Sequence, residues 1–596
     1  MTHPTLGGWQ HLIQGDAQQA LAQLQKLRER LSTDDNAWIA LATPQQLFAQ
    51  WEALQQRSQA GEILPLFGVP FAVKDNIDVE GWTTTAACPA FAYEAEHDAT
   101  AVARLKAAGA IVIGKTNLDQ FATGLVGTRS PFGAVANTFD PRYVSGGSSS
   151  GSASAVARGL VPFALGTDTA GSGRVPAGFN NIVGLKPTKG WFSSQGVVPA
   201  CRLNDTLSVF ALTVEDAYQV ATIAGGTDDN DCYSRSHPAT APAAFPACPR
   251  IAIPEQPTFM GDAQAEAAWQ KALEHLEACG ATLHPIDFSV FSELAEQLYQ
   301  GPWVAERTAA IGTQLDHPDQ MDPTVYQIIA SGRKFSAVEA YQAEYLRATL
   351  ARHIHAQLAQ FDGLAVPTVP TIRTHAEIEQ EPIRYNSEFG TYTNFTNLAD
   401  LSALALPGPF RADGLPAGIT LLAPAWHDRA LASFGIRWQR HLGLPLGATS
   451  SLLPEQFPTL PPSETHVRLA VVGAHLRGMP LNFQLTSRHA SFVTTTTTAP
   501  RYRLYALADT QPSKPGLVRY AEGAAIEVEL WDVPLAHFGA FVAEVPFPLS
   551  IGSLELSNGE WVKGFLCESA VLESAQDISH YGGWRAWIGQ QETAHV

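Results

Sequence analysis

Basic residues are scarce in this sequence. Its 596 residues include 38 Lys and Arg against 57 Asp and Glu, which gives a formal net charge of −19 at pH 7. A protein that binds nucleic acid or an anionic membrane presents a basic patch. We therefore expect neither nucleic acid nor a membrane among the partners.

Paired cysteines and long apolar runs are also missing. The six cysteines are scattered and form no CxxC pair, so the sequence predicts neither a structural zinc site nor a disulfide framework. No apolar run reaches the roughly 18 residues that indicate a membrane helix. Residues 1–20 lack a basic region followed by an apolar core, so we expect no signal peptide and a cytoplasmic protein.

Apolar residues make up 45% of the chain and charged residues 16%, which is typical of a globular protein. The chain is too long for one ordinary domain, and about two or three are expected. Early helices are predicted at 16–31, 44–56 and 99–108, and early strands at 66–73, 110–113 and 160–165. After Asp205, helices and strands alternate at 214–224, 250–254, 264–279 and 281–288. This alternation predicts an α/β fold with a large sheet that helices cover on both faces.

Two clusters of glycine and serine mark the middle of the chain, GGSSSG at 146–151 and GSG at 171–173. Glycine lets the backbone approach a ligand closely, so main-chain N–H groups can be exposed there. Hydroxyl groups beside such a backbone indicate a serine nucleophile with an oxyanion-binding loop. A flexible Gly/Ser linker is the alternative, but a linker would not continue into an apolar strand and the sequence TDTAG.

The stretch from 143 to 188 resembles the signature of the amidase-signature family, in which GGSSGGSA, GTDTGGSIRxPA and GLKPT follow one another. The resemblance continues upstream in GVPFAVKDN at 68–76 and GKTN at 114–117. It implies the fold of that family, an α/β arrangement with a large mixed β-sheet. The resemblance also implies a serine–serine–lysine triad and no metal or organic cofactor.

By position in these motifs, Lys74 would be the general base, Ser148 a relay serine that follows a cis peptide bond, and Ser172 the nucleophile. The resemblance places the oxyanion hole at the main-chain N–H groups of Thr169, Ala170, Gly171 and Ser172. A serine hydroxyl is a poor nucleophile until a base takes its proton. A lysine can be that base only when it is neutral, which requires burial or a nearby positive charge.

The signature departs from the family pattern at three positions, Ser150, Ala170 and Gly173. The N–H group of Ala170 can still serve the oxyanion hole if this residue need not adopt a positive φ. The variant TAGSGRVPA resembles the allophanate hydrolase branch of the family, which points to a small substrate. Asp168 and Lys186, which flank the loop, are interpreted as structural residues.

Two other motifs compete with this interpretation. Residues 109–116 satisfy the phosphate-loop pattern GxxxxGK[ST], but their four intervening residues are predicted to form a strand, whereas a phosphate loop follows its strand. Residues 147–151 fit the GxSxG elbow of α/β-hydrolases around Ser149. That elbow must follow a buried strand, and residues 137–144 are turn-like.

A third region, GPWVAER at 301–307, also resembles the allophanate hydrolase branch. The resemblance implies that Tyr299 and Arg307 bind a substrate carboxylate and that Gly124 borders the substrate. Arginine suits that role because it is permanently charged and can hold a carboxylate through two parallel hydrogen bonds. A helix-surface arginine is the alternative that spacing alone favours.

The composition changes after residue 445. We predict an amidase-signature domain at 1–445, a proline-rich linker at 446–466 and a smaller β-rich domain at 467–596. VGAHLRGMPLN resembles the C-terminal domain of allophanate hydrolases, which has a γ-glutamylcyclotransferase-like barrel. His475 and His489 are its candidate functional residues, with Glu555 or Glu568 as carboxylate partners. A structural histidine is the alternative for each.

The resemblance implies a hydrolase of a small carboxylated amide, allophanate (urea-1-carboxylate), that releases ammonia and carbon dioxide in urea degradation. It also implies a functional link to a urea carboxylase, and we expect a homodimer. One alternative is a broad-specificity amidase or an amidotransferase component that acts on aminoacyl-tRNA. A further alternative is that residues 467–596 form a non-catalytic assembly module.

Overall fold

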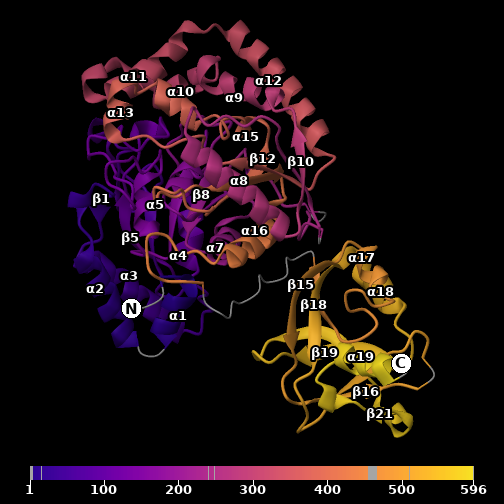
Figure 1. Ribbon diagram of the computed structural model, residues 1–596. Helices are drawn as coiled ribbons and strands as arrows, with labels where there is room; N and C mark the ends of the chain where they lie inside the picture. Colours follow the sequence, from indigo (N-terminus) through magenta and orange to yellow (C-terminus); the bar gives the residue numbers. More distant parts are fainter. Residues whose placement is uncertain are drawn as a thin grey trace. The chain divides into compact units, whose positions relative to one another are not determined.

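The computed structural model describes residues 4–14, 17–238, 241–246, 248–453, 466–508 and 510–594. Its internal contacts divide the chain into two units, Met1–Gln456 and Phe457–Val596, which are coloured indigo to orange and orange to yellow in Figure 1. Residues 454–465 of the predicted linker lie outside the described residues. The predicted domain boundaries therefore stay a prediction.

The first unit is built on one mixed sheet, which has eleven strands within the described residues. In spatial order these are β1 (Trp38–Leu41), β5 (Ile111–Thr116), β2 (Pro70–Lys74), β6 (Phe163–Asp168), β8 (Thr206–Ala211), β7 (Val183–Lys186), β12 (Leu401–Leu406), β13 (Ile419–Pro424), β11 (Gly363–Pro367), β9 (Arg250–Pro254) and β10 (Thr282–Ile286). A separate small ribbon pairs β3 (Thr83–Thr84) with β4 (Tyr93–Glu94). Most of the central strands are fully buried apolar runs, as expected for a sheet covered on both faces.

Strand direction decides where the functional side chains meet. Strand β2 runs parallel to both β5 and β6, with Lys74 opposite Thr116 and Val73 opposite Leu165. The carboxyl ends of these three neighbouring strands therefore lie at the same edge of the sheet. In open α/β sheets ligands bind outside that edge, so Lys74 and the residues that follow β6 are placed where a ligand can reach them.

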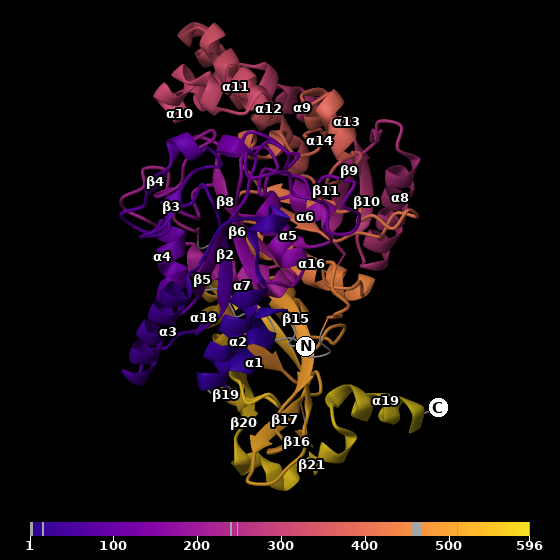
Figure 2. The same cartoon turned by 90° about the vertical axis from the view of Figure 1, so that its left-hand side faces the viewer.

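Helices cover both faces of the sheet (Figures 1 and 2), which confirms the predicted fold class. Helices α4, α7, α16 and α8 form one continuous packed group, while α5 and α6 form another, and α9, α12 and α15 pack together. The helices of the first unit are α1 (Leu6–Gln14), α2 (Ala17–Arg30), α3 (Pro44–Gln59), α4 (Thr100–Ala107), α5 (Ser150–Ala157), α6 (Val175–Phe179), α7 (Val214–Ala224), α8 (Ala263–Ala278), α9 (Ser289–Gln300), α10 (Val304–Ile311), α11 (Pro323–Ala330), α12 (Ala337–Leu358), α13 (His375–Gln380), α14 (Arg384–Phe389), α15 (Phe395–Leu398) and α16 (Asp428–Leu442).

Local sequence signals explain several helix starts. Thr43 and Gln46 form a capping box at the start of α3, and the Thr213 side chain caps α7. Helix α7 occupies the predicted range, 214–224. Strand β6 runs three residues beyond its predicted end because its last two residues, Thr167 and Asp168, are polar yet buried. Hydrophobic patterning cannot detect such a strand end.

The second unit is β-rich, as predicted. Its strands form a five-stranded sheet in the order β15-β18-β14-β20-β19 and a three-stranded sheet in the order β17-β16-β21 within the described residues. Their bounds are β14 (His466–Val471), β15 (Ser491–Thr497), β16 (Tyr502–Ala506), β17 (Pro515–Arg519), β18 (Glu527–Pro534), β19 (Leu549–Glu555), β20 (Trp561–Cys567) and β21 (Gln576–Asp577), with α17 (Phe483–Thr486), α18 (Leu535–Ala543) and α19 (Trp584–Ala594). One apolar core takes residues from both sheets, including Leu504, Leu517 and Leu530.

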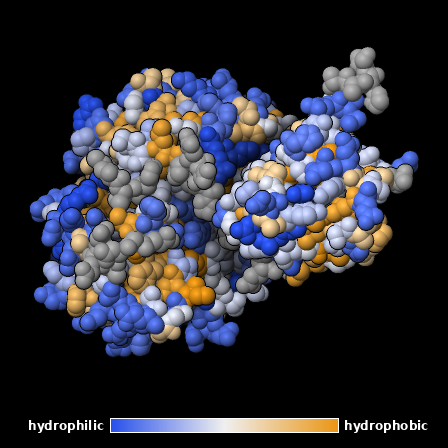
Figure 3. Space-filling view, turned by 90° about the horizontal axis from the view of Figure 1, so that it is seen from below, coloured by the Kyte–Doolittle hydropathy of each residue, from blue (hydrophilic) through white to orange (hydrophobic). Residues whose placement is uncertain are grey.

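The surface agrees with the composition. Figure 3 shows hydrophilic residues over most of the visible face, with apolar patches between them, as is usual for a folded protein. None of the helices in the described ranges combines the length and the apolar character that a membrane span requires.

Candidate active site

Lys74 ends β2 and is fully buried. Its Nζ donates hydrogen bonds to Ser148 Oγ and to Thr167 Oγ1, each at 2.7 Å. Burial lowers the pKa of Lys74 to about 7 against the opposing charges of Asp119, Asp205 and Asp168, and Arg307 lowers it further. A substantial fraction of Lys74 is therefore neutral near pH 7, as a general base requires.

Ser148 is fully buried within the first Gly/Ser cluster, two residues before α5 begins. The Gly147–Ser148 peptide bond is cis, as the resemblance implied. The main-chain oxygen of Ser148 accepts a hydrogen bond from Asp119 N at 3.1 Å. The serine is thus fixed on its backbone side, while its hydroxyl faces Lys74.

Asp168 organises the loop that carries Ser172. Its two carboxylate oxygens accept hydrogen bonds from Gly171 N at 3.1 Å and Gly173 N at 2.9 Å. The Arg174 guanidinium binds the same carboxylate through two bonds of 2.9 Å, and both side chains are fully buried. Burial alone would raise the pKa of Asp168, but the charge and hydrogen bonds of Arg174 lower it below its ordinary value. These contacts support the structural interpretation of Asp168.

The loop leaves fewer oxyanion donors than the sequence predicts. The N–H group of Gly171 is occupied by Asp168, so it is not free to bind an oxyanion. Among the described residues, the N–H groups of Thr169, Ala170 and Ser172 have no hydrogen-bond acceptor. Ala170 is not among the residues with positive φ, so alanine is accommodated there without strain. The candidate oxyanion hole therefore has three donors.

Ser172 lies buried in the loop between β6 and α6. Its hydroxyl makes no hydrogen bond within the described residues, so the structure joins Lys74 to Ser148 but contains no bond from Ser148 to Ser172. Thr167, the second partner of Lys74, lies five positions before Ser172 on the strand that supports this loop.

Tyr299 and Arg307 lie together, at the end of α9 and within α10. Arg307 Nη2 donates to the Tyr299 hydroxyl at 3.2 Å, and the guanidinium lies 5.1 Å from the centre of the ring. Arg307 Nη1 donates to Thr123 Oγ1 at 2.9 Å. The side chain is buried, yet Arg307 forms no ion pair with any described residue. Such a buried, unpaired cation is suited to bind an anion.

Gly124 is a glycine because Asp119 lies against it. A Cβ atom at this position would lie 2.5 Å from Asp119 Oδ2. The Asp119 carboxylate in turn accepts hydrogen bonds from the main-chain N–H groups of Val126, Gly127 and Arg129, at 3.0 to 3.2 Å. Packing within the loop thus already requires glycine here, and contact with substrate stays a prediction.

The structure excludes both competing interpretations, the phosphate loop and the GxSxG elbow. Residues 111–116 form β5, so the GxxxxGK[ST] pattern includes most of a strand and cannot form a phosphate loop. Ser149 is the N-cap of α5, and its Oγ donates to the Thr167 main-chain oxygen at 3.2 Å. No described strand runs into Ser149, so the GxSxG elbow is excluded.

His475 lines a cavity of about 190 Å³ in the second unit. Its Nε2 lies 2.8 Å from Gln484 Oε1, and its ring stacks on Phe565 with a centroid distance of 4.9 Å. Burial lowers the pKa of His475. Lys514 and Glu544 also line this cavity. The arrangement could bind a small polar molecule, but the contacts of His475 are equally those of a structural histidine.

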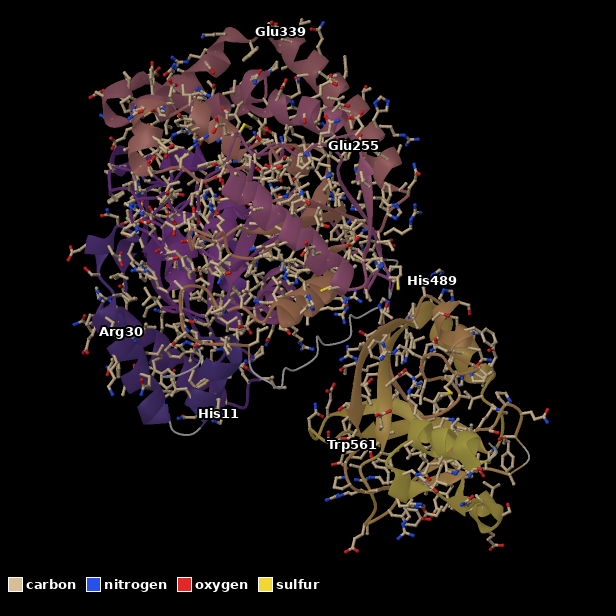
Figure 4. All side chains as sticks on the ribbon, in the orientation of Figure 1. His11, Arg30, Glu255, Glu339, His489 and Trp561 are labelled. Carbon is tan, nitrogen blue, oxygen red and sulfur yellow. The ribbon has the colours of Figure 1, made fainter. Side chains whose placement is uncertain are left out.

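The other candidates of this unit do not join His475. His489 is exposed, and Figure 4 shows it at the rim of the second unit. Glu555 is paired with Arg519 at 2.6 Å, and Glu568 is exposed. None of these three lines the cavity, whose carboxylate is Glu544 instead. Within the described residues no cluster of His, Cys, Asp or Glu could hold a metal ion.

Sequence reasoning missed three groups that complete the site: Thr167 beside Lys74, Thr123 beside Arg307, and Asp119 beneath Gly124. Thr167 lies within the signature stretch at 143–188, and Thr123 directly precedes Gly124. A single threonine, however, forms no sequence pattern that indicates a function. Their partners lie 93 and 184 positions away in the sequence. Only the fold shows which hydroxyl groups face the ionisable side chains.

Comparison with known proteins identifies the family to which this chain belongs. A family model described as Amidase matches residues 19–432. The chain belongs to the amidase family. A second family model, described as Allophanate hydrolase C-terminal domain, matches residues 467–589 beyond the amidase part.

Relatives of this amidase-family chain share both parts. The urea amidolyase of Saccharomyces cerevisiae is 48% identical over 573 residues, which cover 93% of this chain and 31% of that protein. The urea amidolyase of Lachancea kluyveri is 46% identical over 590 residues, which cover 95% of this chain and 32% of that protein. The solved structure of Kluyveromyces lactis allophanate hydrolase is 44% identical with a TM-score of 0.81, covering 98% of this chain and 99% of the other. The chain spans about a third of the length of the curated urea amidolyases it matches.

Proposed function

We propose that this chain is an allophanate hydrolase that releases ammonia and carbon dioxide in the degradation of urea. The observation that carries the proposal is the presence of two buried basic side chains with different tasks. Lys74 has a pKa of about 7 and contacts a serine hydroxyl, while the Arg307 guanidinium lacks an ion-pair partner among the described residues. A base and an anion site in one buried region suit an amide that carries a carboxylate.

In this mechanism Lys74 takes the proton of Ser148 while Ser148 takes that of Ser172. The Ser172 oxygen attacks the terminal amide carbonyl, and the N–H groups of Thr169, Ala170 and Ser172 stabilise the oxyanion. The proton returns through Ser148 to the leaving nitrogen, which departs as ammonia. Water then cleaves the acyl-enzyme by the same path in reverse.

Substrate choice would come from the carboxylate pocket. Tyr299 and Arg307 hold the carboxylate, so an uncharged amide would leave a buried guanidinium without a partner. The carbamate-type product loses carbon dioxide. The relatives named urea amidolyase support a functional link to a urea carboxylase, which would supply the substrate. The homodimer and the cytoplasmic location stay predictions.

The deciding experiment measures ammonia release from allophanate by the native chain and by Ser172→Ala and Arg307→Ala. We expect Ser172→Ala to lose turnover and Arg307→Ala to lose most activity toward the carboxylated substrate. Arg142→Ala is the matched control, because the Arg142 side chain is 78% exposed. Equal rates for the native chain and Arg307→Ala would contradict the substrate assignment, and faster turnover of simple aliphatic amides would favour a broad amidase.

A second candidate function concerns the His475 cavity. Its lining of His475, Lys514 and Glu544 supports a role for the second unit in the loss of carbon dioxide, against a role in assembly alone. A His475→Asn variant would then release the first ammonia at the native rate but accumulate a carboxylated product, detectable by ¹³C NMR from labelled allophanate. Native product ratios in this variant would favour the assembly role.

A further inference from the structure

Two buried arginines donate hydrogen bonds to different oxygens of one threonine. Arg307 Nη1 donates to the hydroxyl of Thr123 at 2.9 Å, and Arg129 Nη1 donates to the main-chain oxygen of the same residue, also at 2.9 Å. Arg129 and Arg307 are 3% and 1% exposed. Any movement of Thr123 therefore shifts a hydrogen bond of each guanidinium.

No described carboxylate forms an ion pair with the Arg129 side chain, although the charges of Asp119 and Asp322 act on it from farther away. Its Nη2 donates to the Pro382 main-chain oxygen at 2.6 Å, and its buried Nε has no hydrogen-bond partner. Arg129 forms no ion pair with any described residue. The carboxylate of Asp119 accepts the main-chain N–H of Arg129 at 3.0 Å, and its other oxygen accepts two further main-chain N–H groups.

The position of Arg129 links it to the carboxylate pocket. Tyr299 receives a hydrogen bond from Arg307, and both residues act electrostatically on Arg129. Burial lowers the pKa of Arg129, Asp119 and Tyr299 oppose that shift, and Arg307 adds to it. The two guanidinium charges repel each other, and a bound anion would relieve that repulsion.

We propose that Arg129 is a positioning residue for the carboxylate end of the substrate. It holds the main chain of Thr123, so that the hydroxyl of this residue stays where it orients Arg307, and its own charge adds to the attraction for an anion. Both arginines then contribute to the selection of carboxylated amides. Arg307 and its partner Tyr299 touch the substrate, whereas Arg129 does not. This inference rests on the proposed function for the identity of the anionic group.

Measurements of ligand binding test this inference independently of catalysis. Malonamate and malonamide differ only in that a carboxylate of the first is an amide in the second. We expect Arg129→Gln, in a Ser172→Ala background, to raise the Kd of malonamate about 10- to 100-fold, the range for a charge-assisted interaction. The Kd of malonamide should change by a clearly smaller factor. Calorimetric titration of the full chain gives both constants.

Three further variants distinguish a positioning role of Arg129 from a general loss of protein structure. Arg129→Lys should restore part of the selectivity, because it keeps the charge, whereas Arg142→Gln, which removes an exposed charge, should leave both constants unchanged. Thr123→Val keeps the main-chain bond to Arg129 but removes the hydroxyl that Arg307 contacts, so it should lower the selectivity as well. If Arg129→Gln fails to fold, the Thr123→Val result decides.

An unchanged Kd ratio in Arg129→Gln or in Thr123→Val would overturn the inference, as would equal losses for both ligands or no measurable binding of malonamate to Ser172→Ala. Failure of the proposed function gives a different pattern. If the native chain does not release ammonia from allophanate but the selectivity still depends on Arg129, only the substrate assignment fails.

Discussion

Lys115 Nζ lies 3.0 Å from Asp75 Oδ1, and both side chains are fully buried. Asp75 directly follows Lys74 in the sequence, and its second oxygen accepts a hydrogen bond from Thr85 N at 3.0 Å. The carboxylate beside the candidate base is thus occupied by another lysine. The ion pair leaves the Lys74 amine to its two hydroxyl partners.

Removing Lys115 should therefore destabilise the protein strongly. Lys115→Met leaves the Asp75 carboxylate buried and unpaired, and we expect a loss of about 3–5 kcal/mol in the free energy of unfolding. Urea denaturation measures it. The double variant Lys115→Met/Asp75→Asn removes the charge but keeps an acceptor for Thr85, so it should recover much of the loss. Additive losses in the double variant would show that the pair is not the cause.

The rate of amide hydrolysis should rise with pH through a pKa of about 7. The neutral form of Lys74 is the base, and its fraction increases as pH rises past the value that burial sets. The measurement is kcat/KM for allophanate between pH 5.5 and pH 9. Lys74→Arg should be inactive across this range, because a guanidinium does not lose its proton. A rate that falls through pH 7 would contradict the assignment of Lys74.

Replacing Lys74 by methionine should stabilise the protein at neutral pH. Lys74 has a pKa of about 7 in the folded chain against an ordinary 10.5, so between these values the unfolded chain binds more protons and the stability of the native protein rises with pH. Lys74→Met removes that penalty and also two hydrogen bonds. We expect a net gain of about 2 kcal/mol at pH 7 that shrinks toward pH 10.

Urea denaturation at pH 7, 8 and 9 checks this prediction. The native protein and Lys74→Met should converge as the pH rises. Parallel stability curves would mean that the Lys74 amine is not desolvated in the folded chain. Lys115→Met serves as the contrast, because removal of that buried lysine should destabilise at each pH.

Gly124→Ala should disturb the loop that carries Thr123. The new Cβ atom would lie 2.5 Å from Asp119 Oδ2, so the carboxylate or the main chain must move, at a cost of about 1–3 kcal/mol. We expect lower stability and a higher KM for allophanate. Gly7→Ala is the matched control, since its Cβ would meet no atom within 4 Å. A Gly124→Ala variant as stable as Gly7→Ala would contradict the crowding.

The sequence predicted those parts of the site that rest on local patterning. Apolar patterning predicted a buried strand at 66–73, where β2 lies. Spacing alone favoured a surface position for Lys74, and only the VKDN motif indicated that this lysine is buried. The alternation of helices and strands predicted the α/β sheet because each element has its own periodicity. The contacts of Thr167 and Thr123 could not be predicted, because they depend on strand order and on α10 packing against a distant loop.

In the candidate oxyanion loop, sequence also fails to predict a contact between residues that are only a few positions apart. The sequence places four N–H groups at 169–172, but it cannot show that the Asp168 carboxylate turns back to occupy one of them. In the second unit, the resemblance gave His475 and His489 as candidates without indicating where either lies in the fold. The structure separates them because His489 follows the end of α17, whereas His475 faces the interior.

The outermost strand of the large sheet, β10, contains Pro285. A proline has no amide hydrogen to offer to an incoming strand, so another polypeptide cannot extend the ladder past this position. At the opposite margin β1 is only four residues long. Both margins of the sheet are thus poor templates for the strand-by-strand growth that leads to aggregation.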